Sequence, residues 1–147
     1  MSDPPVNIRP AKTDDYDAVA AVWSAAGLPA SLRGRDSRES FVEQLHWFPT
    51  CYLVAEIDGR IVGVVLGTHD RRKGWVNRLA VHPRFRRCGI AAHLITACEK
   101  ALRAEGIDII ATLIEEGNEA SICVFEHSGY HSDVPARYYR KRWRDEI

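Results

Sequence analysis

The sequence contains few residues that could hold a metal ion or form disulfides. Its four cysteines lie far apart, with no Cys-x-x-Cys pair and no histidines beside them at the spacing of metal ligands. The six histidines show no such spacing among themselves. We therefore expect reduced thiols, no disulfide framework and no metal site.

Long apolar runs and an excess of one charge are also missing. No stretch approaches the ~18 consecutive apolar residues that a membrane-spanning helix needs. The first residues, Met-Ser-Asp-Pro-Pro, lack the charged and apolar regions of a secretory signal. The formal net charge is zero, which argues against general binding to nucleic acids or membrane surfaces. We expect a cytoplasmic protein that binds neither nucleic acid nor membrane.

The chain does contain enough apolar sequence for one hydrophobic core. Hydrophobic residues make up 46% of the 147 residues, and there is no linker, internal repeat or low-complexity segment. Residues 1–147 therefore predict a single domain. The arginines and lysines cluster near the middle and near the C-terminus of this neutral chain. Such local basic patches favour a discrete anionic ligand over a polymer.

Hydrophobic periodicity and turn residues predict the element order β-α-α-β-β-β-α-β-α-β. The expected strands cover residues 6–11, 51–57, 61–67, 75–81 and 108–114, with a last strand through Tyr138, Tyr139 and Arg140. The expected helices begin near Thr13 and Ser37, which we expect to be N-caps, near Cys88, and at Asn118 or Ser121. Asp58-Gly59 predicts a tight hairpin between the second and third strands. Three consecutive strands form an antiparallel meander, whereas the helical crossover between residues 81 and 108 requires a parallel pair. The sequence thus predicts one mixed α/β (α+β) domain.

A basic turn at the start of one predicted helix is typical of a phosphate-binding site. Residues 86–91 follow the apolar run 75–81 and open into a strongly periodic helix. The first N–H groups of a helix have no internal partner, and the helix dipole adds partial positive charge there. Gly89 and Ala91 leave the backbone uncovered, so that a diphosphate can approach the amides.

Two segments resemble the signature motifs of the GNAT N-acetyltransferase superfamily. Arg86-Arg87-Cys88-Gly89-Ile90-Ala91 matches the R/Q-x-x-G-x-G/A signature, in the strand-to-helix context that this signature requires. Residues 118–130 are similar to the family's N-x-A-x-x-x-x-Y-x-x-x-G-F helix. The element order also resembles the family along nearly the whole chain.

The resemblance implies a mostly antiparallel central sheet with a splayed parallel pair and helices on both faces. It also implies acetyl-CoA as the donor substrate, without a metal. The amides of residues 87–91 would hold the diphosphate, and a bulge near Leu79–Ala80 would direct an N–H at the thioester carbonyl. The backbone of Leu79 and Val81 would pair with the pantetheine arm. The implied acetyl-CoA-binding residues are Leu79, Ala80, Val81, Arg86, Arg87, Cys88, Gly89, Ile90, Ala91, Asn118 and Phe125.

The reaction implied by the resemblance is direct attack of an amine on the thioester. Phe125 stands where the family often has a tyrosine that acts as general acid, and phenylalanine has no proton to donate. Tyr138 and Tyr139 resemble a Tyr-Tyr strand that lines the acceptor site in protein N-terminal acetyltransferases, and only one of two adjacent strand residues can face the site. Glu115 and Glu116 follow a predicted strand end and are candidate general bases. The predicted catalytic residues are Tyr138, Tyr139 and Glu116.

The predicted function is N-acetyl transfer from acetyl-CoA to a primary amine, which is a protein N-terminus, a lysine or a small molecule. The expected partners are acetyl-CoA and this amine, and the expected assembly is a monomer or a homodimer. A non-catalytic acyl-CoA-binding module is the alternative, because Phe125 replaces the usual tyrosine. A protein that modifies or binds nucleic acid is a third hypothesis, which the zero net charge argues against.

Overall fold

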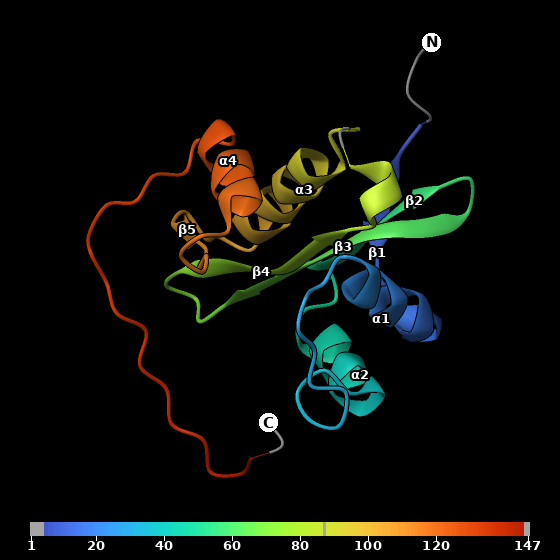
Figure 1. Ribbon diagram of the computed structural model, residues 1–147, viewed down its shortest axis with the longest axis horizontal. Coiled ribbons are helices and arrows are strands. Elements are labelled where there is room, and N and C mark those ends of the chain that lie inside the picture. The colour runs from blue at the N-terminus through green and yellow to red at the C-terminus, as the bar shows by residue number, and fades with distance from the viewer. Residues whose placement is uncertain (1–4, 87, 146–147) are drawn as a thin grey trace.

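The computed structural model describes residues 5–86 and 88–145, which contain a five-stranded mixed sheet (Figure 1). The strands lie side by side in chain order from β1 to β5. Neighbours from β1 to β4 are antiparallel, whereas β4 and β5 are parallel. The strands are β1 (Asn7–Pro10), β2 (Tyr52–Ile57), β3 (Arg60–His69), β4 (Gly74–Val81) and β5 (Ile110–Ala111). The mixed, mostly antiparallel sheet predicted from the sequence is thus confirmed.

Helices cover both faces of this sheet. The pair α1 and α2 packs on one face, and α3 and α4 pack on the other (Figure 1). Their bounds are α1 (Tyr16–Ala25), α2 (Arg38–Trp47), α3 (Ile90–Ala104) and α4 (Glu119–His127). Among the residues that the structure describes, no helix is both long and apolar enough to cross a membrane.

Each face of the sheet buries its own apolar cluster. On β2, Leu53 and Ala55 belong to the cluster under α3, and Tyr52 and Val54 belong to the cluster under α1 and α2. This alternation follows from the two-residue period of a strand. Because both faces are buried, the central strands read in the sequence as nearly continuous apolar runs.

Two local predictions are confirmed by backbone and side-chain geometry. Asp58 and Gly59 have φ values of 51° and 75°, which suit a two-residue hairpin between β2 and β3. Ser37 caps α2, and its Oγ accepts the Ser40 N–H at 3.1 Å. Both features therefore depend on short polar residues or glycine at the required positions.

The cap predicted at Thr13 is wrong. Thr13 lies inside a short 3₁₀ turn (Thr13–Asp15) that precedes α1. The Asp15 Oδ2 accepts the Lys12 N–H at 2.7 Å. Lys12, one residue earlier, is therefore the N-cap of this turn, and the carboxylate of Asp15 within the turn accepts its N–H.

The last predicted strand, through Tyr138, Tyr139 and Arg140, is also wrong. Residues 131–145 form neither helix nor strand, and Figure 1 shows them running outside the packed elements. One cause is that β5 is only two residues long, which leaves a further strand almost no edge to pair with. A second cause is the concentration of arginine and lysine in this segment, because neighbouring like charges disfavour pairing at an edge.

The close packing of α3 on β3 can be tested at Gly67. A Cβ atom at this position would lie 2.7 Å from the Cys98 Sγ and 3.2 Å from the Cys51 Cβ. Gly67→Ala is therefore expected to lower the free energy of unfolding by ~1–3 kcal/mol, as overpacking of a core does. Cys98→Ala removes the sulfur, so the alanine at position 67 should be less costly in that background. Urea unfolding of the four proteins measures this coupling, and an unchanged cost would contradict the contact.

Candidate functional site

A groove opens where β4 and β5 diverge. Their ladder ends at Trp75–Ala111, so β5 is much shorter than the strand predicted over residues 108–114. One more link follows, in which the Thr112 Oγ1 donates to the Val76 carbonyl at 2.9 Å. Beyond this link the two segments flank a groove of about 900 Å³. The splayed parallel pair predicted from the family resemblance is therefore present.

The walls of the groove come from segments that lie far apart in the sequence. β4 and the chain after β5 flank it, while the N-terminus of α3, part of α4 and the loop after α1 complete it. Figure 1 shows α3 and α4 next to each other over this part of the sheet. The lining consists of residues 26–29, 76–81, 85–86, 89–92, 112–115, 118, 120–121 and 124–125.

A β-bulge interrupts β4 beside the groove. Where β3 has the single residue Val65, β4 has two, Arg78 and Leu79. Arg78 has a φ of 54°, in the left-handed region that non-glycine residues rarely adopt. The extra residue shifts the alternation of the strand, so the backbone directions differ before and after the bulge.

This shift determines which backbone groups of β4 face the groove. Before the bulge, the Gly74 N–H and the Val76 carbonyl hydrogen-bond toward the β5 side. After the bulge, the His82 N–H donates to the Val62 carbonyl of β3 at 2.8 Å. The backbone of this even-numbered residue therefore faces β3, whereas the backbones of Gly74 and Val76 face the β5 side. Backbone direction alternates along a strand, so the N–H and carbonyl groups of Leu79 and Val81 face the groove.

The N-terminus of α3 forms a basic part of the groove. Gly89 precedes the helix with φ 72° and ψ 14°, a left-handed conformation that glycine adopts without strain. Residues 89–92 line the groove, and the first N–H groups of a helix have no partner within it. Arg86 also lines the groove, with an exposed side chain, whereas Cys88 is half-buried against the core and does not. Arg87 lies outside the described residues.

α4 supplies a further wall with one polar and one apolar residue. The Asn118 Oδ1 accepts the Ser121 N–H at 3.2 Å and thereby caps the helix. Phe125 is buried, and its ring packs edge to face on Tyr130 with the centroids 5.1 Å apart. The Tyr130 hydroxyl donates to the Glu99 Oε2 at 2.7 Å, and burial together with this bond raises the pKa of Tyr130. Phe125 is thus a fixed apolar surface without a proton donor.

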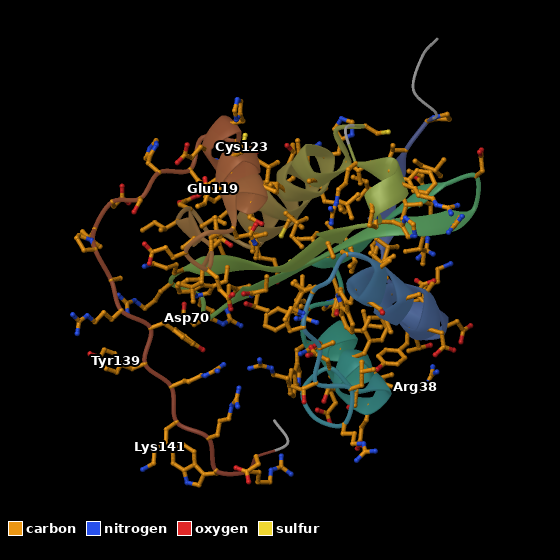
Figure 2. The ribbon with its side chains drawn as sticks, in the orientation of Figure 1. Arg38, Asp70, Glu119, Cys123, Tyr139 and Lys141 are labelled. Atoms are coloured by element: carbon orange, nitrogen blue, oxygen red, sulfur yellow. The ribbon has the colours of Figure 1, made fainter. Side chains whose placement is uncertain are left out.

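The structure separates the four residues considered for proton transfer. Glu115 lines the groove, whereas Glu116 does not, and both are exposed. Tyr138 and Tyr139 are 69% and 81% exposed and lie outside the groove lining. Figure 2 shows Tyr139 pointing outward from the C-terminal segment. Within the described ranges, no three His, Cys, Asp or Glu side chains gather where they could hold a metal ion.

Arg78 is the residue at this site that sequence reasoning missed. In the sequence it is one of several basic residues near the middle of the chain. In the structure its guanidinium lies 4.6 Å from the Trp23 ring centroid, and Nη1 donates to the Pro29 carbonyl at 2.7 Å. Burial lowers the pKa of Arg78, and the charge of Asp36, whose Oδ1 lies 3.5 Å from Nε, opposes that effect. The sequence signal for this role is a charged residue within an apolar strand.

These contacts hold the loop between α1 and α2 against the bulge. Asp36 is buried, and its Oδ2 accepts the Ser31 N–H at 2.8 Å. Its backbone carbonyl accepts the Tyr16 hydroxyl at 2.7 Å. Arg78 contacts both Asp36 and Pro29, and Pro29 lines the groove. The side chain of Arg78 therefore joins the bulge to the α1–α2 loop, and that loop forms part of the groove wall.

Comparisons with known proteins identify relatives along most of the chain. The model of the Acetyltransferase (GNAT) family matches residues 21–130. An acetyltransferase of Pectobacterium atrosepticum is 38% identical over 128 residues, which are 86% of this chain and 89% of that protein. An acetyltransferase of Photorhabdus laumondii is 35% identical over 125 residues, which are 85% of this chain and 86% of that protein.

A solved structure shows the same fold. The PaiA N-acetyltransferase from Thermoplasma acidophilum, in complex with coenzyme A, superposes with a TM-score of 0.78 at 18% identity. The match covers 88% of this chain and 91% of that chain. The family predicted from the two sequence motifs is confirmed by the matching family model and by the two acetyltransferase relatives. The chain belongs to the GNAT family and is an acyl-CoA-dependent N-acetyltransferase.

Proposed function

We propose that the groove binds acetyl-CoA and that a primary amine attacks its thioester there directly. The observation that carries this proposal is the β4 bulge, which turns backbone N–H groups toward the groove beside the N-terminus of α3. The groove volume of about 900 Å³ falls within the range of small-molecule sites. A thiol-release assay with acetyl-CoA and a panel of primary amines and peptides tests it. If acetyl-CoA binds but no acceptor in the panel gives thiol release, the alternative of a non-catalytic acyl-CoA-binding module is supported instead.

In this proposal the diphosphate of acetyl-CoA binds at the N-terminus of α3. The unpartnered N–H groups donate to phosphate oxygens, and the helix dipole favours the negative charge. The space beside Gly89 is open, because a Cβ atom built there would meet nothing within 4 Å. Arg86 adds positive charge at the groove, and the same role for Arg87 stays a prediction.

The pantetheine arm then runs along the free edge of β4. Backbone groups of Leu79 and Val81 pair with its amides as a neighbouring strand would, while Ala80 between them turns its backbone toward β3. The Leu79 N–H donates to the thioester carbonyl and stabilises the negative charge that develops there. Loss of one such preorganised donor typically lowers kcat by about 10²–10³. Asn118 and Phe125 bound the arm on the α4 side.

The chemical step needs a neutral amine, a polarised carbonyl and a proton for the departing thiolate. Holding both reactants in place can itself supply ~7–11 kcal/mol of the barrier. A free thiol has a pKa of ~8.5, so the thiolate is a tolerable leaving group and water can protonate it. Glu115 is the acidic residue among the described residues that line the groove, and it takes the proton of the amine.

The diphosphate position can be tested with two charge reversals. Arg86→Glu is expected to weaken acetyl-CoA binding by about tenfold or more, because it replaces a phosphate partner with a like charge. Arg84→Glu is the matched control, since Arg84 is exposed nearby but does not line the groove. Calorimetric titration measures both affinities, and high salt should reduce their difference. Equal affinities for the two variants would place the diphosphate elsewhere.

A pair of neighbouring substitutions identifies the general base. Glu115→Gln is expected to lower kcat by about 10²–10⁴-fold, the usual contribution of acid–base catalysis, with little change in acetyl-CoA affinity. Glu116→Gln is expected to keep the turnover of the unmodified enzyme, because Glu116 does not line the groove. Steady-state thiol release measures both. A loss in Glu116→Gln alone would support the role predicted from the sequence and contradict the one proposed for Glu115.

The tyrosine pair can be tested in the same assay. Tyr138→Phe and Tyr139→Phe are expected to keep full turnover, because both rings are exposed and outside the groove lining. Water then supplies the proton to the thiolate. If either variant loses turnover at unchanged acetyl-CoA affinity, that tyrosine is the general acid, and residues 131–145 must reach the groove during the reaction.

A further inference from the structure

A second cavity, of about 340 Å³, lies on the α1–α2 face of the sheet. Asn77 and Arg78 line both this cavity and the groove. The bulge places these consecutive side chains on one face, where the Asn77 Nδ2 donates to the Thr68 Oγ1 at 3.0 Å and Arg78 contacts Trp23. The cavity therefore adjoins the part of the groove proposed to hold the thioester. Its lining consists of Arg35, Asp36, Gln44, Leu66, Thr68, Asn77 and Arg78.

Positive charge exceeds negative charge in this cavity. It contains two guanidinium groups, Arg35 and Arg78, and one carboxylate, Asp36. The Nε and Nη2 atoms of Arg78 are buried and make no hydrogen bond with the described residues, and Nε lies 3.5 Å from the Asp36 Oδ1. Arg35 is exposed and makes no hydrogen bond or ion pair with any residue in those same ranges. Two cations that line one cavity, of which the exposed Arg35 keeps its donors unused, are an arrangement that an anion stabilises.

We propose that this cavity binds a carboxylate of the acceptor, so that the acceptor is a primary amine that carries a carboxylate close to its amino group. The proposal rests on the acetyl transfer proposed above and adds the class of acceptor. The carboxylate binds between Arg35 and Arg78, where its negative charge separates two like charges, and it accepts hydrogen bonds from the exposed Arg35 guanidinium. The amine then extends past the bulge toward the thioester.

Asp36 does not repel such an acceptor from the cavity. Its Oδ2 already accepts the Ser31 N–H, and its Oδ1 faces the Arg78 Nε at 3.5 Å. The negative charge of Asp36 is therefore partly neutralised by the Ser31 N–H of the loop and by one side of the Arg78 guanidinium. Arg35 supplies the net positive charge that remains, at the exposed side of the cavity.

Two sources of the carboxylate fit a cavity of this size. A volume of about 340 Å³ is at the lower end of small-molecule sites and suits a group no larger than an amino acid. A free amino acid or diamino acid provides the carboxylate beside its amine. A peptide with aspartate or glutamate at its N-terminus provides it from the first side chain. Parallel assays with both kinds of acceptor distinguish these sources.

The test compares each acceptor with its uncharged counterpart. Thiol release is measured for free amino acids against their carboxamides, and for peptides with N-terminal Asp or Glu against the same peptides with Asn or Gln. The kcat/KM of at least one carboxylate acceptor should exceed that of its amide by about tenfold or more, as expected for a hydrogen bond to a charged group. Equal or higher values for the amides in every pair would overturn the proposal.

Arg35→Gln and Arg33→Gln then locate the preference. Arg35→Gln is expected to raise the KM of the carboxylate acceptor and to bring the carboxylate-to-amide ratio close to one, while Arg35→Lys keeps part of the ratio. Arg33 is exposed in the same loop and does not line the cavity, so Arg33→Gln should leave the ratio unchanged. The same fall in both glutamine variants would overturn the assignment to this cavity.

The outcomes separate the two proposals. Thiol release with amides as efficient as with carboxylates leaves acetyl transfer in place and overturns the carboxylate site alone. Absence of thiol release with every acceptor overturns both. Acetyl-CoA affinity measured by calorimetry in each variant shows whether a loss of turnover arises in the groove or in the cavity.

Discussion

The site depends on one irregular position, the bulge at Arg78 and Leu79 in β4. Without the extra residue, the backbone alternation set by Gly74 and Val76 would continue, and Leu79 and Val81 would turn toward β3. The left-handed backbone of Arg78 costs on the order of 1 kcal/mol or more, so it persists only where surrounding contacts hold it. The contacts of its guanidinium with the α1–α2 loop provide that restraint.

The two sides of β4 are built from different chemistry. The side proposed to bind acetyl-CoA presents backbone N–H groups of β4 and of the N-terminus of α3, which many sequences can supply. The cavity on the α1–α2 side is lined by particular side chains, including Arg35, Asn77 and Arg78. Because Arg78 lines both the groove and the cavity, the proposals link the position of the acceptor to the direction of the Leu79 N–H.

Those parts of the structure that need a particular residue type at a particular position could be predicted from the sequence. The Asp58–Gly59 hairpin and the glycine before α3 both require a positive φ, so the local pattern contains the signal. The absent last strand depends on how much edge β5 offers, which is a tertiary property. Arg78 could not be assigned because its side-chain direction depends on the bulge, and a strand with strict alternation would place it on the other face.

Amide hydrogen exchange at β4, followed residue by residue by NMR, tests whether the bulge turns the N–H groups of Leu79 and Val81 toward bound acetyl-CoA. We expect the N–H groups of Leu79 and Val81 to exchange faster than those of Ala80 and His82 in the free protein, because His82 bonds to Val62 and Ala80 pairs with Val64 of β3. Acetyl-CoA should then slow Leu79 and Val81 selectively. Slow exchange at Leu79 and Val81 in the free protein, or rates there that acetyl-CoA does not change, would contradict this role of the bulge.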